Sequence, residues 1–291
     1  MVVSLHLSSL LGAAACLLAA DAFTAPVAPR FHASPPSLSR LSRGKIALRG
    51  WGDDVEFKSA KVISNDAAAS GMRSITVEAG DDILGPYTVP GQFVQIKETE
   101  DSKAGFYAIA SAPGATPGVC ELLIKESEGN EWSPGNQWLC GAEAGAELIM
   151  SPAMGGGFKV DEKFGDVKDV LLFAAGSGIS PIRATIESGK LDGKGVKLYY
   201  GARSPSLMAY QDKFRDWEAA GVTVVPVLSR AGDEPWEGRA GYVQAALAED
   251  GVAGDAATTG ALMCGMKGMA EDVKVALIEA GVDEDKVLTN F

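Results

Sequence analysis

The second half of the chain alternates strand-like and helix-like segments, and this alternation limits the fold more than any other sequence feature. Four short apolar runs are each followed by a helix-like segment: VLLFAAG, VKLYYGA, VTVVPVLS and ALMCG. Strands that alternate with helices form parallel sheets with helices on both faces. We therefore expect residues 166–291 to form a doubly wound parallel-sheet α/β domain.

One helix-like segment has a clear amphipathic pattern. Its large apolar side chains recur at helical spacing: Leu207, Tyr210, Phe214 and Trp217. Ser204 is placed to cap the N-terminus, and Pro205 suits a first helical turn. The pattern predicts one long helix whose aromatic side chains lie in the core and not in a binding site.

The preceding part of the chain is typical of β-structure. Strand-like runs alternate with Gly, Pro and Asp turns: SITVEA, QFVQIKE, FYAIAS, CELLIKE and ELIMSP. No convincing helical pattern interrupts them, so we expect an antiparallel β-barrel or sandwich over residues 53–155. A glycine-rich junction at residues 151–166 then leads into the parallel-sheet domain.

The first 52 residues have the composition of targeting segments. A short apolar run, LSSLLGAAACLLAA, predicts a signal peptide over residues 1–22. Residues 23–52 contain five basic and no acidic side chains, as transit peptides do. The junction DAFTAP resembles the bipartite presequences of algae with complex plastids, which implies delivery to the plastid (chloroplast). The alternative is a secreted protein with a disordered start.

Charge and histidine content narrow the function classes. Residues 1–52 carry five of the 26 Lys and Arg and one of the 38 Asp and Glu, so residues 53–291 hold 21 basic and 37 acidic side chains, a net charge of −16. This charge argues against nucleic acid and anionic membranes as partners, and we expect no integral membrane segment in the body. His6 and His32, the two histidines of the sequence, both precede the body. We expect no metal site, and any redox chemistry then needs an organic cofactor.

One loop has the composition of a phosphate-binding turn. In AAGSGISPIRA, Gly176 and Gly178 follow a buried strand and precede a helix. Glycines allow the backbone to approach a phosphate closely, and the helix N-terminus stabilises its charge. Pro181 suits the start of that helix. The motif is common by itself, and its strand-turn-helix context makes the phosphate-binding interpretation the favoured one.

Several motifs together, in their order and spacing, resemble the ferredoxin–NADP reductase superfamily. Those of the nucleotide domain are GSGISP, YYGAR, LSR, GYVQ and CGMKGM, and those of the flavin barrel are PGQF and YAIAS. Within this superfamily the chain is similar to the plant "fruit protein" oxidoreductases. The resemblance implies a flavin-binding β-barrel followed by an NAD(P)-binding domain, with FAD or alternatively FMN, and NADP or alternatively NAD, as cofactors.

The resemblance also assigns roles to the neutral stretch GFYAIASAPG. Its flavin-lining residues would be Tyr107, Ala108, Ile109, Ala110 and Ser111, with the Tyr107 ring on the flavin. The stretch departs from the family pattern R-x-Y-S-x-x-S, because Gly105 replaces the arginine and Ala108 replaces a serine. The second phosphate turn reads SPGN, with Gly135 and Asn136 in the binding positions. The alternative is a barrel that has lost its flavin.

By the same resemblance, residues of the second domain would contact the pyridine nucleotide. The pyrophosphate loop would be Gly176, Ser177 and Gly178, with Pro181 behind it. Ser229, Arg230 and Arg203 would face the adenosine 2′ position, and Tyr242 would stack on adenine. The catalytic positions would be Cys264, with Gly265 beside the nicotinamide, and Phe291, whose ring would cover the flavin. The alternatives are a turn for Ser229 and Arg230, and core positions for Tyr242 and Cys264.

The combined interpretation is a flavoprotein that exchanges hydride with NADPH. The electron acceptor, a small molecule or a protein, is not determined by the sequence. An acidic ferredoxin is disfavoured, because it would meet a body of the same charge sign. The alternative function is a non-catalytic nucleotide-binding or redox-sensing protein that keeps the reductase fold.

Overall fold

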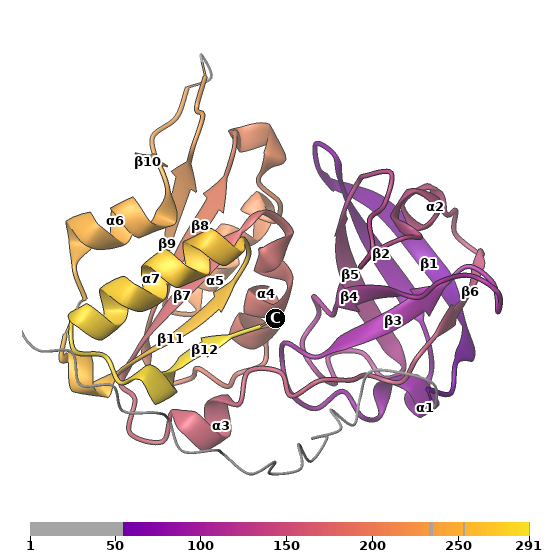
Figure 1. Cartoon of the computed structure of the whole chain (residues 1–291), viewed down its shortest axis with the longest axis horizontal. Helices are drawn as coiled ribbons and strands as arrows, with labels where there is room; N and C mark the ends of the chain where they lie inside the picture. Colours follow the sequence, from indigo (N-terminus) through magenta and orange to yellow (C-terminus); the bar gives the residue numbers. More distant parts are fainter. Residues whose placement is uncertain (1–54, 233–234, 253, 291) are drawn as a thin grey trace, which may run out of the picture. The chain divides into compact units, whose positions relative to one another are not determined.

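The computed structural model describes residues 55–232, 235–252 and 254–290. The predicted signal and transit segments and Phe291 lie outside the described residues. The described part contains two six-stranded sheets, one antiparallel and one parallel, drawn in different colours of the chain gradient in Figure 1. This architecture confirms the predicted fold class.

The antiparallel sheet is built from the first half of the described chain. Its strands are β1 (Lys58–Ala69), β2 (Met72–Glu78), β3 (Phe93–Lys97), β4 (Gly105–Ala108), β5 (Val119–Lys125) and β6 (Glu147–Met150), in the order β4-β3-β6-β1-β2-β5. An isolated bridge between Ile109 and Leu122 joins the two ends of this order and closes the sheet into a barrel. Alternate side chains of the strands, such as Val94 and Ile96, fill the barrel core.

The barrel contains elements that the sequence pattern did not predict. Strand β1 is the longest strand described, but its residues KSAKVISNDAAA mix charged and small side chains and lack a plain apolar alternation. Two short helices, α1 (Asp81–Leu84) and α2 (Asn136–Gly141), interrupt the strands. The expectation of no helix was wrong here, because helices of one or two turns are too short to give a recognisable 3.6-residue pattern.

The parallel sheet follows a short helix, α3 (Val160–Lys163), that lies within the glycine-rich junction. Its strands are β7 (Asp169–Ala175), β8 (Gly195–Ala202), β9 (Val222–Leu228), β10 (Arg239–Ala240), β11 (Thr259–Cys264) and β12 (Val287–Thr289), in the order β10-β9-β8-β7-β11-β12. The connecting helices are α4 (Ile179–Glu187), α5 (Phe214–Ala219), α6 (Val243–Asp250) and α7 (Lys267–Glu279).

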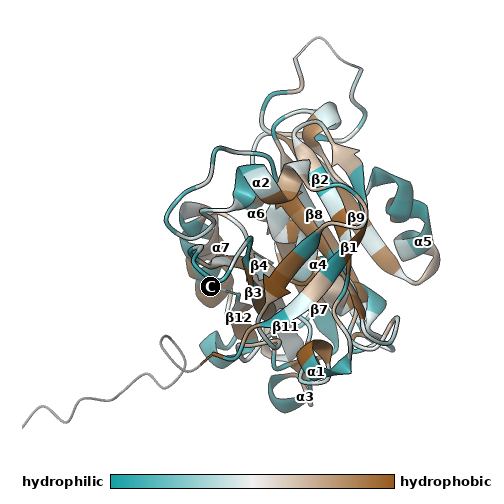
Figure 2. Cartoon of the chain, turned by 90° about the vertical axis from the view of Figure 1, so that its right-hand side faces the viewer, coloured by the Kyte–Doolittle hydropathy of each residue, from teal (hydrophilic) through white to brown (hydrophobic). Residues whose placement is uncertain are grey.

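Both faces of the parallel sheet are covered by helices. In β7, Leu172 and Ala174 pack in one core with residues of α4 and α5, whereas Leu171 and Phe173 pack in another with residues of α6 and α7. This two-sided burial explains why the strand is a continuous apolar run. In Figure 2 the helix α5, at the edge of the molecule, is largely teal, whereas brown segments occur on the strands.

The single long helix predicted from Ser204 to Trp217 does not form. Two 3-10 turns, Pro205–Leu207 and Gln211–Lys213, precede the short helix α5. Tyr210 separates them with a φ of 61°, in the left-handed region, which ends any continuous helix. The aromatic side chains are nevertheless in the core, as predicted: Tyr210 and Trp217 are buried and Phe214 packs against them.

Candidate functional site

The residues predicted to bind the nucleotide gather at one edge of the parallel sheet. Gly176 directly follows β7, Arg203 follows β8, Ser229 follows β9 and Gly265 follows β11. The carboxyl ends of parallel strands meet at the same edge, where open α/β sheets bind their ligands. The structure therefore brings these four positions together.

The glycine-rich loop forms a 3-10 turn that packs tightly against the end of β11. Gly176 has a φ of 56°, a conformation that glycine adopts without strain. A Cβ added to Gly178 would lie 2.3 Å from the carbonyl oxygen of Cys264. The Ser180 hydroxyl donates a hydrogen bond of 2.8 Å to the carbonyl of Ser177, and Pro181 lies buried in the first turn of α4. The loop thus packs closely against the end of β11 at Gly178, where there is no room for a side chain.

Two arginines flank Ser229 at the ends of neighbouring strands. The Arg230 N–H donates to the carbonyl of Arg203 at 2.8 Å, and the Ser229 N–H donates to the carbonyl of Ala202 at 3.0 Å. Both arginine side chains are exposed, and neither forms an ion pair with another residue of the described part. The arrangement concentrates positive charge beside a hydroxyl, which suits an anionic ligand group.

Tyr242 and Cys264, two further residues predicted to contact the nucleotide, differ in their exposure to solvent. Tyr242 precedes α6 and is 57% exposed, so the alternative of a core tyrosine does not hold. Cys264 is partly buried at the end of β11, and its thiol lies 3.8 Å from the carbonyl oxygen of Asn290. Burial raises the pKa of Cys264 to about 12, so it is a neutral thiol at physiological pH.

The predicted flavin strand places its residues on different faces. Tyr107 is buried in the barrel core, 7% exposed, and a Cβ on Gly105 would lie 2.6 Å from its hydroxyl oxygen. Gly105 thus leaves room for the tyrosine ring, which explains physically why a larger residue is absent there. Burial, with a further contribution from Cys140, raises the pKa of Tyr107 to about 12. Ile109 and Ala110 are fully buried, whereas Ala108 is half-buried on the opposite face.

An aromatic cluster that the sequence analysis missed lies on the face opposite Tyr107. The Phe106 ring centroid is 5.8 Å from that of Phe93 and 6.1 Å from that of Trp132. Trp132 is 56% exposed. The signal was present in GFYAIASAPG, because alternation in a strand puts Phe106 and Tyr107 on opposite faces. The strand therefore presents aromatic surface on both sides.

Asn136, at the start of α2, has an acceptor that nothing in the described part satisfies. The side chain is buried, and its Nδ2 donates to the carbonyl of Lys125 at 2.7 Å and to the Ser127 hydroxyl at 2.9 Å. Its Oδ1 has no hydrogen-bond partner among the described residues. Buried acceptors are rarely left unpaired, so this position fits a ligand with hydrogen-bond donors, which a flavin with its ribityl chain provides. Gly135 precedes it and leaves open space where a Cβ would stand.

Two general properties of the described residues bear on the class of protein. No group of three or more His, Cys, Asp and Glu side chains among them is arranged to hold a metal ion. None of the helices in the described ranges has the length and apolar character needed to cross a membrane.

Comparisons with known proteins identify related oxidoreductases. Residues 172–275 match the family of oxidoreductase NAD-binding domains. The chain is 34% identical over 235 residues to the fruit protein pKIWI502 of Actinidia deliciosa, covering 76% of this chain and 73% of that protein. It is 31% identical over 192 residues to ferredoxin–NADP reductase B of Sorangium cellulosum, covering 62% of this chain and 75% of that protein.

Solved structures share the fold. A ferredoxin–NADP+ reductase from Neisseria gonorrhoeae with bound FAD and NADP superposes with a TM-score of 0.69 at 18% identity, over 81% of this chain and 99% of that chain. The cytochrome b5 reductase domain of Ulva prolifera nitrate reductase gives a TM-score of 0.66 at 16% identity, over 80% of this chain and 97% of that chain.

A closed antiparallel barrel followed by a doubly wound domain with a glycine-rich turn defines a class of two-domain oxidoreductases that use a flavin and a pyridine nucleotide. The chain belongs to the ferredoxin–NADP reductase superfamily, as the motifs in its sequence predicted, and it is a flavin-dependent NAD(P)H oxidoreductase with FAD and NAD(P) as cofactors. The roles of single residues at the site stay predictions.

Proposed function

We propose that this protein is an NADPH-preferring reductase that passes hydride between the nucleotide and its FAD. The observation that carries this proposal is the pairing of Arg203 and Arg230 beside Ser229. A 2′-phosphate carries nearly two negative charges and is best held by cations and hydroxyl donors. NADH, in contrast, is usually recognised by a carboxylate that accepts from the ribose hydroxyls. Ser229 offers no carboxylate at that position.

The chain contributes binding and orientation, because the flavin supplies the electron chemistry when bound. Gly176 and Gly178 admit the pyrophosphate close to the backbone, and the neutral end of β11 at Cys264 offers an uncharged wall for the nicotinamide. On the barrel, Asn136 offers its unpaired acceptor to the flavin. These residues would hold the flavin and the nicotinamide against each other, which is what hydride transfer requires of a protein.

The net charge of the protein limits which electron acceptors it can use. Residues 53–291 carry a net charge of −16, and an acidic ferredoxin would be repelled by such a surface. We therefore propose a small molecule or a protein that is not strongly acidic as the acceptor. Measuring NADPH oxidation with neutral quinones and with an acidic ferredoxin, at low and at high salt, tests this. A ferredoxin turned over faster than the quinones at low salt would refute it.

The decisive experiment for the proposed function is spectroscopic. We expect purified residues 53–291 to carry FAD, with absorbance bands at roughly 375 and 450 nm that bleach on anaerobic addition of NADPH. NADH should bleach them more slowly at equal concentration. A protein that cannot be loaded with FAD, or whose loaded form does not bleach, would favour a nucleotide-sensing role.

We also propose that the protein acts in a plastid. The support is the composition of residues 1–52, in which an apolar run precedes an acid-free basic segment. The test is to fuse these residues to a fluorescent protein in an alga with a complex plastid. Plastid fluorescence is expected, and secretion into the medium would refute the proposal.

A further inference from the structure

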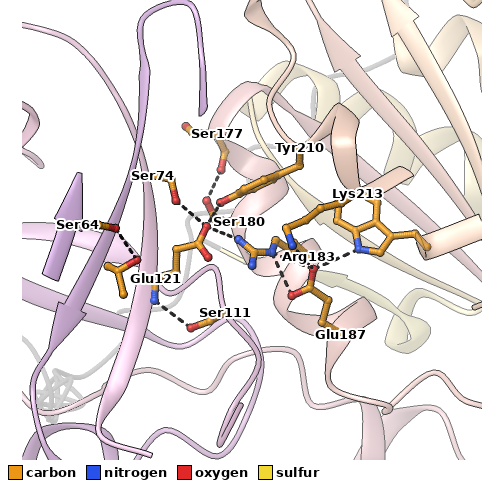
Figure 3. A network of polar contacts seen from close by, with 12 residues as sticks. Ser64, Ser74, Ser111, Glu121, Ser177, Ser180, Arg183, Glu187, Tyr210 and Lys213 are labelled. Atoms are coloured by element: carbon orange, nitrogen blue, oxygen red, sulfur yellow. Dashed lines mark hydrogen bonds and ion pairs between the residues drawn. The ribbon is translucent and has the colours of Figure 1, made fainter. Parts of the chain in front are cut away.

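A partly buried ion-pair cluster, centred on the buried Arg183, joins the barrel to the parallel-sheet half of the described unit. We call it the Glu121–Arg183 cluster, and its members are Ser74, Glu121, Arg183, Glu187, Tyr210, Lys213 and Trp217. Arg183 on α4 donates through Nη1 to Glu121 on β5 and through Nε to both carboxylate oxygens of Glu187, at 3.0 and 3.1 Å. Figure 3 shows Glu121 extending from its strand towards the guanidinium of Arg183.

The surrounding residues fix the position of Glu121 and Arg183. Glu121 accepts hydrogen bonds from the hydroxyls of Ser74 at 2.7 Å and Tyr210 at 3.0 Å. The guanidinium of Arg183 lies over the Tyr210 ring, 4.5 Å from its centroid, and the residue is 5% exposed. A planar guanidinium with an acceptor on two sides and a ring on its face has little freedom to move.

The charges of the cluster balance, which explains how the buried guanidinium of Arg183 stays paired. Arg183 stands between Glu121 and Glu187, and Lys213 lies 3.8 Å from Glu187 as the second cation. Burial acts to raise the pKa of Glu121, but the hydrogen bond and charge of Arg183 outweigh it, and the net pKa is below the usual value. If Glu121 and Glu187 were neutral, the buried charge of Arg183 would be left unpaired.

Each end of the cluster is connected to one of the two predicted cofactor segments. On the barrel side, the Glu121 N–H donates to the Ser111 hydroxyl at 3.0 Å, and its carbonyl accepts from the Ala110 N–H at 2.7 Å. On the other side, Arg183 lies in α4, which begins directly after the Gly176–Gly178 turn. Strand ends and a short helix are stiff connectors, so the ion pair sets the spacing between the two segments.

We propose that Arg183 is a positioning residue for hydride transfer, which acts through Glu121 to hold the flavin-binding strand and the nucleotide-binding loop at a fixed separation. The inference rests on the proposed function, because it concerns the geometry between its two cofactors. Transfer between bound rings depends steeply on their alignment, and a displacement of about 1 Å can slow a reaction on the order of 100-fold. Neither Arg183 nor Glu121 needs to touch a reacting atom for this effect.

The test uses three substitutions that weaken the Glu121–Arg183 ion pair to different degrees. Glu121→Gln keeps the shape and removes the charge, Glu121→Asp keeps the charge and shortens the arm by one methylene, and Arg183→Lys keeps a cation without the planar fork. The matched control is Asp250→Asn, which removes a carboxylate that pairs with Lys197 and Arg239 entirely within the parallel-sheet half. FAD content, NADPH affinity, melting temperature and the single-turnover rate of flavin reduction are measured for each.

We expect the single-turnover reduction rate to fall about 10- to 100-fold in Glu121→Gln and Arg183→Lys, and less in Glu121→Asp, while FAD content and NADPH Kd change less than about threefold. Asp250→Asn should lower the melting temperature by a similar amount and leave the rate within about twofold. The positioning role is wrong if NADPH reduces the flavin of the Glu121 and Arg183 variants as fast as that of the wild type. It is also wrong if Asp250→Asn slows flavin reduction as much as those variants do. If the wild type itself is not reduced, the proposed function fails first. A Glu121 or Arg183 variant that loses FAD altogether would show a role in holding the cofactor and would also overturn the proposal.

Discussion

Gly178 and the carbonyl oxygen of Cys264 lie so close together that no other amino acid fits between them: a Cβ at residue 178 would stand 2.3 Å from that oxygen. The two residues are 86 positions apart in the sequence and are brought together by the parallel pairing of β7 with β11. This contact fixes the glycine-rich turn against the strand that is predicted to face the nicotinamide.

Substitution of Gly178 by alanine tests that contact. Because the obstructing atom belongs to the backbone, the turn must shift, and we expect a loss of about 1–3 kcal/mol in the free energy of unfolding and at least about tenfold weaker NADPH binding. Calorimetry and nucleotide titration give both values. Gly165→Ala is the control, since Gly165 lies outside the nucleotide motifs and a Cβ there meets nothing within 4 Å, and it should leave both values unchanged.

Substitution of Ser229 by aspartate tests the nucleotide preference. A carboxylate at this position would repel a 2′-phosphate and accept from a free ribose hydroxyl, so the NADPH to NADH ratio of kcat/KM should fall about 5- to 150-fold, equivalent to about 1–3 kcal/mol. The ratio is measured at low salt, where charges are screened least. An unchanged ratio would place Ser229 away from the adenosine ribose, and a wild type that prefers NADH would refute the NADPH assignment.

Gly105→Ala tests the packing beneath the flavin strand. The new Cβ would lie 2.6 Å from the Tyr107 hydroxyl oxygen, and the buried ring has little room to move. We expect about 1–3 kcal/mol of destabilisation and a shift of the visible flavin bands, because Tyr107 must reorient. Gly141→Ala, at the end of α2 where a Cβ is uncrowded, is the matched barrel control. Equal stability of both variants would show that the Tyr107 ring lies elsewhere in solution.

Asp250 predicts a pH dependence of stability. Burial acts to raise its pKa, but hydrogen bonds from Lys197, Tyr199 and Arg239 lower it to about 2 from 3.8. A lowered pKa contributes stability that is fully present above about pH 4 and is lost as the pH falls towards 2, and solvent screening reduces the contribution to about 1 kcal/mol. Urea unfolding at pH 6 and pH 2.5 should therefore show a gap between wild type and Asp250→Asn that narrows at low pH. A gap that stays constant would mean that the carboxylate is not preferentially ionised in the folded state.

The parts of the fold that sequence reasoning recovered are those where burial leaves a local pattern. Strand β7 reads as an unbroken apolar run because helices cover both its faces, and the predicted parallel sheet follows from it. The helix expected from Ser204 failed because Tyr210 has a left-handed φ of 61°. The Tyr210 hydroxyl donates to Glu121, 89 positions away, and no local pattern contains such a contact. The Glu121–Arg183 pair joins residues 62 positions apart and was invisible for the same reason.

The barrel closes at the contact between residues 109–110 and β5, which we call the seam. In the described part, the predicted flavin-binding segment meets β5 through the isolated Ile109–Leu122 bridge and the neighbouring Ala110–Glu121 hydrogen bond, not through a full ladder. Opening such a seam requires far less free energy than global unfolding. Amide hydrogens along the seam should exchange with solvent well before those of the central β1–β2 ladder. If the predicted flavin site is correct, the apoprotein could open at this edge to admit the flavin, and the Glu121–Arg183 cluster would fix the spacing of the two cofactor segments only after the loaded barrel has closed.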